Sequence, residues 1–366
     1  MWNSPWPSAC AGYPSGALAP AAVTRWGVRA NAGAAFGGAA VTTLYNHPGA
    51  YTLGDWPSLW PNGSVAANGG IPQRGNLTRH LARVATDVVA LFPDPEHAGL
   101  VVIDWEEWQP YLNPRATTAY ANASFAAAGG DVAAAVAAWN ASSLEFMART
   151  LETAVALRPR AAWGFYGLVG CYGQWDVAAG GCAAASRARN DALAPLWRAG
   201  SALFPSIYSA CRYSGGAGAG AGAGGGAGQS APPHCLPDAS QANATEAQKI
   251  ALTLQEVQRV NGGGRGGGGG GGGAGGRVPV WPFTWYTLYT HTCAKPPPVG
   301  LGHCPLMRAA PDLDAEFALA RHSGAADGLV VWGSNGDVRA GTDDCAEFGA
   351  YLNETLGPLL QSLVNP

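Results

Sequence analysis

Runs of consecutive apolar residues recur along the chain, separated by segments in which apolar residues follow a helical spacing. Continuous apolar runs are typical of strands that are buried on both faces. We assign strands to residues 1–4, 41–46, 100–105, 161–167, 202–208, 278–286 and 328–334. Because helical segments lie between them, the pattern predicts parallel strands joined by crossover helices.

The helical segments contain residues suited to begin and end them. Asn76 can cap a helix whose apolar residues fall on one face, namely Leu77, Leu81, Val84, Val88 and Leu91. Ser142 and Glu145 form a potential capping box for a second helix, which we expect to end at Arg158 and Pro159. Further helices are predicted around residues 250–257, over 313–322 and over about 344–363.

A closed α/β barrel in a single domain, residues 1–366, fits this order better than an open sheet, because no GxGxxG motif follows the first strand. In such barrels the chemistry lies at the carboxyl ends of the strands. The polar and aromatic residues at these ends are Asp104, Glu106, Tyr166, Tyr208, Trp285 and Trp332.

Asp104 and Glu106 end an apolar strand and are two positions apart. Alternate residues of a strand share a face, so both carboxyl groups are expected in one pocket, where repulsion raises the pKa of one of them. A protonated acid beside an ionised one suits glycosidic cleavage. The alternative is a solvated pair of acids at a strand end. Glu107 is expected to point the other way.

The aromatic residues at the strand ends can stack on sugar rings, or they can simply plug the mouth of the barrel. Fourteen tryptophans in a chain with only 12% charged residues favour a carbohydrate groove. A net charge of -3 offers no electrostatic footprint for nucleic acid. No apolar stretch is long enough to span a membrane.

Metal and cofactor chemistry finds no support in the sequence. The seven histidines include no HExxH motif, and we interpret His47, His80, His97 and His291 as loop or surface residues. Two glycine-rich runs, at about 214–229 and 261–277, lack the Gly-Lys-Ser/Thr ending of a phosphate-binding loop. They are expected to be flexible insertions.

Eight cysteines and six Asn-x-Ser/Thr sequons favour an oxidising, secreted or lumenal setting, although no signal peptide is visible. Three pairs are close in sequence: Cys171 with Cys182, Cys211 with Cys235, and Cys293 with Cys304. Cys10 and Cys345 remain to tie the two ends of the domain together. The sequons lie at Asn62, Asn76, Asn122, Asn140, Asn243 and Asn353.

Several segments, in order along nearly the whole chain, resemble the hyaluronidases of glycoside hydrolase family 56. They are Gly69-Gly70-Ile71-Pro72-Gln73, Asp104-Trp105-Glu106-Glu107-Trp108, Trp163-Gly164-Phe165-Tyr166-Gly167, Pro205-Ser206-Ile207-Tyr208 and Val331-Trp332-Gly333-Ser334. The resemblance implies a distorted (β/α)7 TIM-like barrel without a cofactor. It also implies the disulfides Cys10–Cys345 and Cys171–Cys182.

The resemblance further implies an endo-β-N-acetylhexosaminidase with a retaining, substrate-assisted mechanism. Glu106 would be the acid and then the base, and Asp104 would orient the substrate's acetamido group. Tyr166, Tyr208, Ser206 and Trp332 match positions around that group. Gln109 replaces the arginine usual in this groove, which puts hyaluronan itself in question as the polymer. The expected partner is a polysaccharide, bound by a monomer; a non-catalytic carbohydrate-binding protein on the same fold is the alternative.

Overall fold

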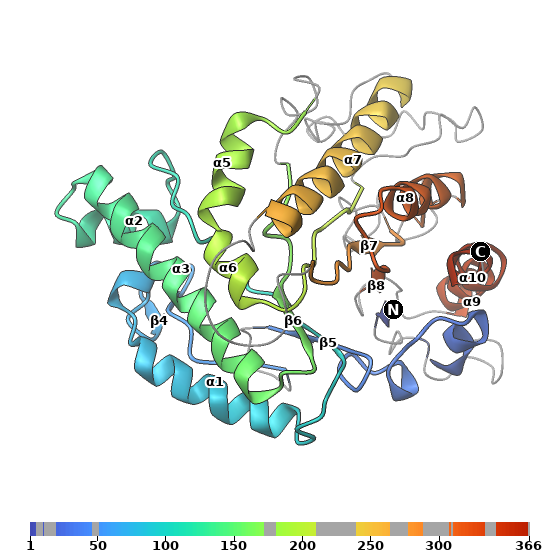
Figure 1. The fold of residues 1–366 in the computed structure, drawn as a ribbon, viewed down its shortest axis with the longest axis horizontal. Helices are drawn as coiled ribbons and strands as arrows, with labels where there is room; N and C mark the ends of the chain where they lie inside the picture. Colours follow the sequence, from blue (N-terminus) through green and yellow to red (C-terminus); the bar gives the residue numbers. More distant parts are fainter. Residues whose placement is uncertain are drawn as a thin grey trace.

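The computed structural model describes residues 1–4, 10, 20–45, 51–171, 181–209, 239–263, 277–287, 307–308, 310–333 and 342–364. Within these residues, short parallel strands form two three-stranded sheets, ordered β2-β5-β6 and β1-β8-β7. The strands are β1 (Trp2–Asn3), β2 (Val41–Leu44), β5 (Leu100–Ile103), β6 (Ala162–Phe165), β7 (Phe283–Trp285) and β8 (Val330–Trp332). Figure 1 shows them at the centre of the molecule, with helices around them. A separate antiparallel hairpin joins β3 (Ser58–Leu59) to β4 (Val65–Ala67).

Residues 202–208, predicted as a strand, make only isolated parallel bridges, so that prediction is wrong. The bridged pairs are Tyr166 with Phe204, Leu203 with Val280, and Ser206 with Phe283. Proline supplies the physical reason, because Pro205 lacks an amide hydrogen and only its carbonyl joins the ladder, accepting from the Phe283 amide at 2.8 Å. The segment nevertheless connects β6 to β7 and so links the two sheets.

On the other side, β1 and β2 are not joined by a backbone ladder within the described residues. The Trp2 amide donates to the Arg29 carbonyl at 2.8 Å. The Asn31 side chain accepts from the Ala40 amide at 2.9 Å and donates to the Val41 carbonyl. Residues 29–31 therefore occupy this edge. The parallel α/β arrangement is as predicted, whereas a continuous seven-stranded barrel is not formed among these residues.

The helices pack outside the strands. Helix α1 agrees with its prediction at both ends, and the Asn76 side chain accepts from the Arg79 amide at 2.9 Å. The last helical segment is continuous but contains a π-helical turn at Leu352–Leu356 between α9 and α10. The helices are α1 (Leu77–Leu91), α2 (Ala119–Ala127), α3 (Val132–Leu157), α5 (Ala184–Ala192), α6 (Ala194–Ala199), α7 (Ala239–Gly263), α8 (Ala310–His322), α9 (Thr342–Tyr351) and α10 (Gly357–Val364).

The capping box predicted at Ser142 and Glu145 is wrong, because α3 begins ten residues earlier. Asp131 caps α3 by accepting from the Ala134 amide at 3.0 Å. The alanine-rich run that follows has a high helix propensity and extends the helix toward its N-terminus. Inside the helix, the Ser142 hydroxyl donates to the Ala138 carbonyl at 2.8 Å instead of capping. The predicted end at Arg158 is confirmed.

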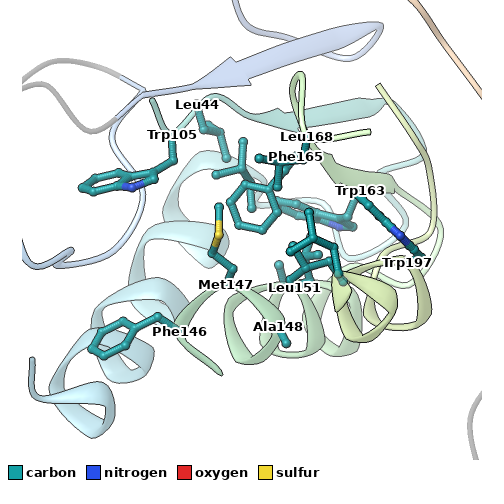
Figure 2. Close-up of a cluster of buried hydrophobic side chains, with 14 of the residues drawn as sticks. Leu44, Trp105, Phe146, Met147, Ala148, Leu151, Trp163, Phe165, Leu168 and Trp197 are labelled. Atoms are coloured by element: carbon teal, nitrogen blue, oxygen red, sulfur yellow. The ribbon is translucent and has the colours of Figure 1, made fainter. Parts of the chain in front are cut away.

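Both faces of the β2-β5-β6 sheet are covered by apolar side chains. Figure 2 shows the outer cluster, in which Met147 and Leu151 of α3 pack beneath Trp163 and Phe165 of β6. A second cluster fills the space enclosed by the strands, with residues from both sheets and the bridging segment: Val41, Leu100, Val102, Ala202, Phe204, Phe283 and Val330. Gly164 allows the bridging segment to approach, since a Cβ there would lie 2.3 Å from the Ala202 carbonyl oxygen.

The Cys10–Cys345 and Cys171–Cys182 disulfides are both formed, as predicted. The first links the N-terminal region to α9, across a sequence separation of 335 residues. The pairs Cys211–Cys235 and Cys293–Cys304 lie outside the described residues, as does the glycine run at 214–229. Of the second run, residues 261–263 form the end of α7, so this insertion begins later than predicted.

Candidate active site

The alternation of side chains along β5 directs the two predicted acids. Leu100 and Val102 belong to the cluster enclosed by the strands, whereas Val101 and Ile103 pack outward. Asp104 continues the inward set, and its amide donates to the Leu44 carbonyl of β2 at 2.8 Å. Asp104 is half-buried, and Glu106 is exposed two residues later. The end of β5 therefore presents two acids at the mouth of the enclosed space.

The tryptophans on either side of Glu106 anchor this segment. Trp105 and Trp108 are buried, with ring centroids 5.1 Å apart, and Trp105 stacks on Trp56 at 4.6 Å. The Trp108 indole N–H also donates to the Pro57 carbonyl at 2.8 Å. Because these contacts hold the backbone on both sides, the position of Glu106 is set by a rigid aromatic core.

His80 packs against this aromatic core, and its prediction as a loop or surface residue is wrong. Its ring lies on α1, is fully buried, and has its centroid 4.5 Å from that of Trp56. Its Nδ1 accepts from the Asp55 amide at 3.1 Å, and its Nε2 lies 2.8 Å from the Thr150 hydroxyl. Burial lowers the pKa of His80 to about 4, so the ring is neutral and structural. His97 does lie in a loop, while His47 and His291 fall outside the described residues.

The two acids differ in their electrostatic surroundings. Burial, and next the nearby Glu106 carboxylate, raise the pKa of Asp104 to about 7, while a hydrogen bond with Tyr45 acts in the opposite direction. Partial desolvation at the mouth of the enclosed space also raises the pKa of Glu106, although its side chain is accessible to solvent. Glu107 is exposed, and its carboxylate accepts from the Tyr120 hydroxyl at 3.4 Å. Asp104 and Glu106 therefore form an interacting pair.

Hydroxyl groups line the space beside this pair. The Tyr166 hydroxyl donates to the Ser206 hydroxyl at 3.1 Å, and the rings of Tyr166 and Tyr208 are 5.9 Å apart. Burial raises the pKa of both tyrosines above its ordinary value, and the negative charge of Asp104 adds to this effect. Both phenols are therefore neutral and able to donate hydrogen bonds.

Two tryptophans line the same space and, with the tyrosines, form its aromatic wall. The rings of Trp285 and Trp332 are 4.9 Å apart, and Tyr208 lies 5.8 Å from the first and 6.1 Å from the second. The Trp332 indole N–H donates to the Tyr45 hydroxyl at 3.2 Å. The structure thus brings together the acids, both tyrosines and both tryptophans, which come from the ends of four strands and from the bridging segment that carries Tyr208.

Two residues depart from the predicted site. Tyr45 was not among the predicted site residues, although its position directly after β2 is the same strand-end signal that identified the others. Gln109 is half-buried, and its backbone carbonyl accepts from the Trp139 indole at 3.0 Å. Among the described residues, the Gln109 side chain makes no hydrogen bond to Asp104 or Glu106.

The arrangement can donate a proton, hold a polar group with neutral hydroxyls and stack aromatic rings on a sugar. In the described ranges, no group of three or more histidine, cysteine, aspartate or glutamate side chains forms a metal-binding cluster. The helices in the same ranges are too short or too polar to cross a bilayer.

Comparison with known families decides which class of protein carries this site. Residues 1–217 match the family model described as hyaluronidase, which is more than half of the chain. The chain belongs to the hyaluronidase family, family 56 of the glycoside hydrolases. The matched part of this hyaluronidase-family chain contains Asp104, Glu106, Tyr166, Ser206 and Tyr208, whereas Trp285 and Trp332 lie beyond it.

Individual hyaluronidases show the same relationship. Human Hyaluronidase-1 is 38% identical over 205 residues, covering 51% of this chain and 45% of that protein. Mouse Hyaluronidase-1 is 28% identical over 364 residues, covering 94% of this chain and 65% of that protein. The chain therefore spans about half to two-thirds of the length of these relatives. The crystal structure of bee venom hyaluronidase with a hyaluronic acid tetramer has the same fold, with a TM-score of 0.71 and 24% identity over 99% of this chain and 98% of that one.

Proposed function

We propose that this chain is an endo-β-N-acetylhexosaminidase that hydrolyses β-1,4 linkages of hyaluronan or a related N-acetylated glycosaminoglycan. The observation that carries the proposal is the interacting pair Asp104 and Glu106 beside a wall of neutral hydroxyls and aromatic rings. The names of its relatives, including one bound to a hyaluronic acid tetramer, support the choice of substrate.

In the proposed mechanism, Glu106 donates its proton to the oxygen of the leaving sugar. The carbonyl oxygen of the substrate's own acetamido group attacks the anomeric carbon, so the enzyme supplies no nucleophile. Glu106, now ionised, then removes a proton from the water that opens the cyclic intermediate. Because the anomeric carbon is attacked twice, each time from the face opposite the departing group, its configuration is retained. The exposed position of Glu106 allows it to reach the linkage between two bound sugars.

Asp104 is proposed to accept a hydrogen bond from the acetamido N–H and to stabilise the positive charge that develops on that group. Burial and the Glu106 carboxylate raise the pKa of Asp104 to about 7. A positive charge beside the carboxylate lowers that pKa and favours the ionised form that the reaction requires. Tyr166 and Tyr208 hold the acetamido group through their hydroxyls, with Ser206 beside them. Trp285 and Trp332 stack on the sugar.

The finer features of the fold belong to the same proposal. Seven parallel segments, with residues 202–208 as the irregular one, would make up the distorted (β/α)7 barrel of a single domain, open between β1 and β2. The two disulfides and the hyaluronidase relatives support a secreted or lumenal location. We expect a monomer that uses no cofactor.

The test is release of reducing ends from hyaluronan, chondroitin and chitin oligomers, with Glu106→Gln as the inactive variant and Glu107→Gln as its matched control. Cleavage that Glu106→Gln abolishes and Glu107→Gln retains supports the proposal and identifies the polymer. Binding without cleavage by folded protein contradicts it and favours a carbohydrate-binding role. Gln109→Arg, tested alongside, shows whether this position sets the preference for acidic sugars.

A further inference from the structure

The hairpin formed by β3 and β4 ends in a tight turn that displays its residues to solvent. The Trp60 amide donates to the Ser64 carbonyl, and the Gly63 amide to the Trp60 carbonyl, both at 2.8 Å. Gly63 has a φ of 83°, a conformation that glycine adopts without strain. Residues 61–64 are all exposed. The turn therefore has a defined shape and projects from the surface.

One of the six sequons, Asn62-Gly63-Ser64, lies at this turn. The Asn62 amide oxygen accepts from the Ser64 amide at 3.0 Å and from the Ser64 hydroxyl at 2.7 Å. Because these bonds engage the oxygen and hold the serine hydroxyl against the asparagine, the side-chain nitrogen is the part presented outward. That nitrogen is the atom to which an N-linked sugar is attached.

The other described sequons are presented differently. The Asn140 side chain is half-buried in α3 and accepts from the Leu112 amide at 2.8 Å, so a glycan there would break a packed contact. Ser124, the third residue of the Asn122 sequon, is fully buried. Asn76 is exposed but caps α1 through its side-chain oxygen. Asn353 is half-buried in the π-helical turn, and its side-chain oxygen accepts from the Arg25 guanidinium. Asn62 alone among these five is exposed and lies in a turn.

Trp60, two residues before Asn62, has a large apolar side chain that is exposed to solvent. It is 59% exposed, the largest value among the large apolar side chains of the described residues, and Val65 beside it is 58% exposed. Leaving an indole in water forfeits the free energy of burying it. The flat ring and the apolar face of a pyranose are complementary surfaces, as in the stacking proposed for the active site.

We propose that Asn62 carries an N-linked glycan and that its first N-acetylglucosamine packs on the indole of Trp60. The inference rests on the proposed secreted or lumenal location, because the sugar is added there. The glycan covers the apolar tip of the hairpin and so stabilises the turn next to the segment that holds Glu106, since Pro57 and Leu59 contact Trp108 and Tyr120.

Site occupancy is the first test. The full chain is produced through the secretory pathway of eukaryotic cells, and glycopeptides are mapped by mass spectrometry after enzymatic glycan release in heavy-oxygen water. We expect Asn62 to be occupied and Asn62→Gln to lose one glycan in gel mobility, while the matched Asn140→Gln variant migrates unchanged. An unmodified Asn62 beside an occupied Asn76 overturns the inference but leaves the location intact. No glycan at any sequon overturns both.

Packing on Trp60 is tested by a double-mutant cycle on thermal unfolding. Asn62→Gln is expected to lower the Tm of the glycosylated protein by roughly 2 °C when Trp60 is present, and by less in Trp60→Ala. Loss of the turn hydrogen bonds is common to both backgrounds and cancels in the difference. The same cycle on chain made in cells that add no glycan should show no coupling. Equal shifts in both glycosylated backgrounds overturn the packing.

Discussion

The hydroxyl group of Tyr45 acts on the carboxyl group of Asp104, whose pKa it lowers, from the adjacent parallel strand: Tyr45 follows β2 and Asp104 follows β5. The register pairs Leu44 with Ile103, so the next residue of each strand, Tyr45 and Asp104, lie opposite one another. Tyr45 also accepts from the Trp332 indole N–H at 3.2 Å. One phenol thus connects the buried acid to the aromatic wall.

Replacing the Tyr45 phenol should change the pKa of Asp104. Tyr45→Phe removes a hydrogen bond that lowers the pKa of Asp104, so we expect that pKa to rise above about 7. A hydrogen bond to a charged group is worth about 1.5–3 kcal/mol, so kcat should fall on the order of tenfold or more. Carboxyl NMR titration and steady-state kinetics measure both effects. Tyr111→Phe, a hydroxyl that contacts Arg189 instead, is the control. An unchanged Asp104 titration would contradict the assignment.

Activity should be confined to acid pH by Glu106. A general acid works in its protonated form, and partial desolvation raises the pKa of Glu106 above the ordinary 4.5. As pH rises through that raised pKa the proton is lost, so kcat should decrease on an alkaline limb centred above pH 4.5. The pH profile of kcat on saturating oligosaccharide checks this. A limb at or below the ordinary value would show that Glu106 is not the acid.

The free energy of unfolding should depend on pH because Asp104 is partly buried. Its pKa is raised from 3.8 to about 7, so the folded chain binds this proton more tightly than the unfolded chain. That stabilisation is present at acid pH and is lost as pH rises between these values. Asp104→Asn cannot ionise and should gain stability over the wild type across this range, by at most roughly 4 kcal/mol. Urea unfolding at pH 4 and pH 8 measures the gain, with the exposed Asp94→Asn as reference. A gain that does not depend on pH would refute the prediction.

A buried ion pair is hydrogen-bonded to β7, the strand that carries Trp285. Arg308 and Glu316 lie 2.7 Å apart with both side chains fully buried. Arg308 also donates to the Trp285 carbonyl at 3.1 Å, and the Thr284 hydroxyl donates to Glu316. Arg308→Met removes the cation that pairs with the buried Glu316 carboxylate, which should cost about 3–5 kcal/mol of unfolding free energy.

The paired variant Arg308→Met with Glu316→Leu separates folding from positioning. It should recover much of the lost stability, because neither charge remains buried alone. The hydrogen bond from Arg308 to the Trp285 carbonyl is still removed, so we expect KM for the oligosaccharide to rise while kcat changes less. Denaturation and kinetics on the same preparations give the comparison. Wild-type KM in the recovered variant would show that Arg308 does not position Trp285.

The two disulfides should contribute unequally. Cys10–Cys345 closes a separation of 335 residues and Cys171–Cys182 one of 11. In the chain-entropy account, the longer loop stabilises by about 3 kcal/mol more, because it restricts the unfolded chain more. Replacing each pair with alanine and measuring urea unfolding compares them. Equal losses would argue against a purely entropic origin.

Features encoded within a few neighbouring residues were predicted well. The apolar runs identified β2, β5, β6, β7 and β8, and Asn76 marked the start of α1, because strand and helix periodicities and caps are local. Predictions failed where a local signal met a competing one. Ser142 resembled a cap but lies inside a helix extended by alanines, and Pro205 interrupted an otherwise apolar strand.

By itself, the sequence determined the parallel α/β order and the placement of Asp104 and Glu106 at a strand end. Only the tertiary structure decided that Tyr45 contacts Asp104, that Trp332 donates to Tyr45, and that Arg308 lies buried against Glu316. Tyr45 and Trp332 are separated by 287 residues. Contacts over such distances depend on how strands and helices pack in three dimensions, and no local periodicity encodes them.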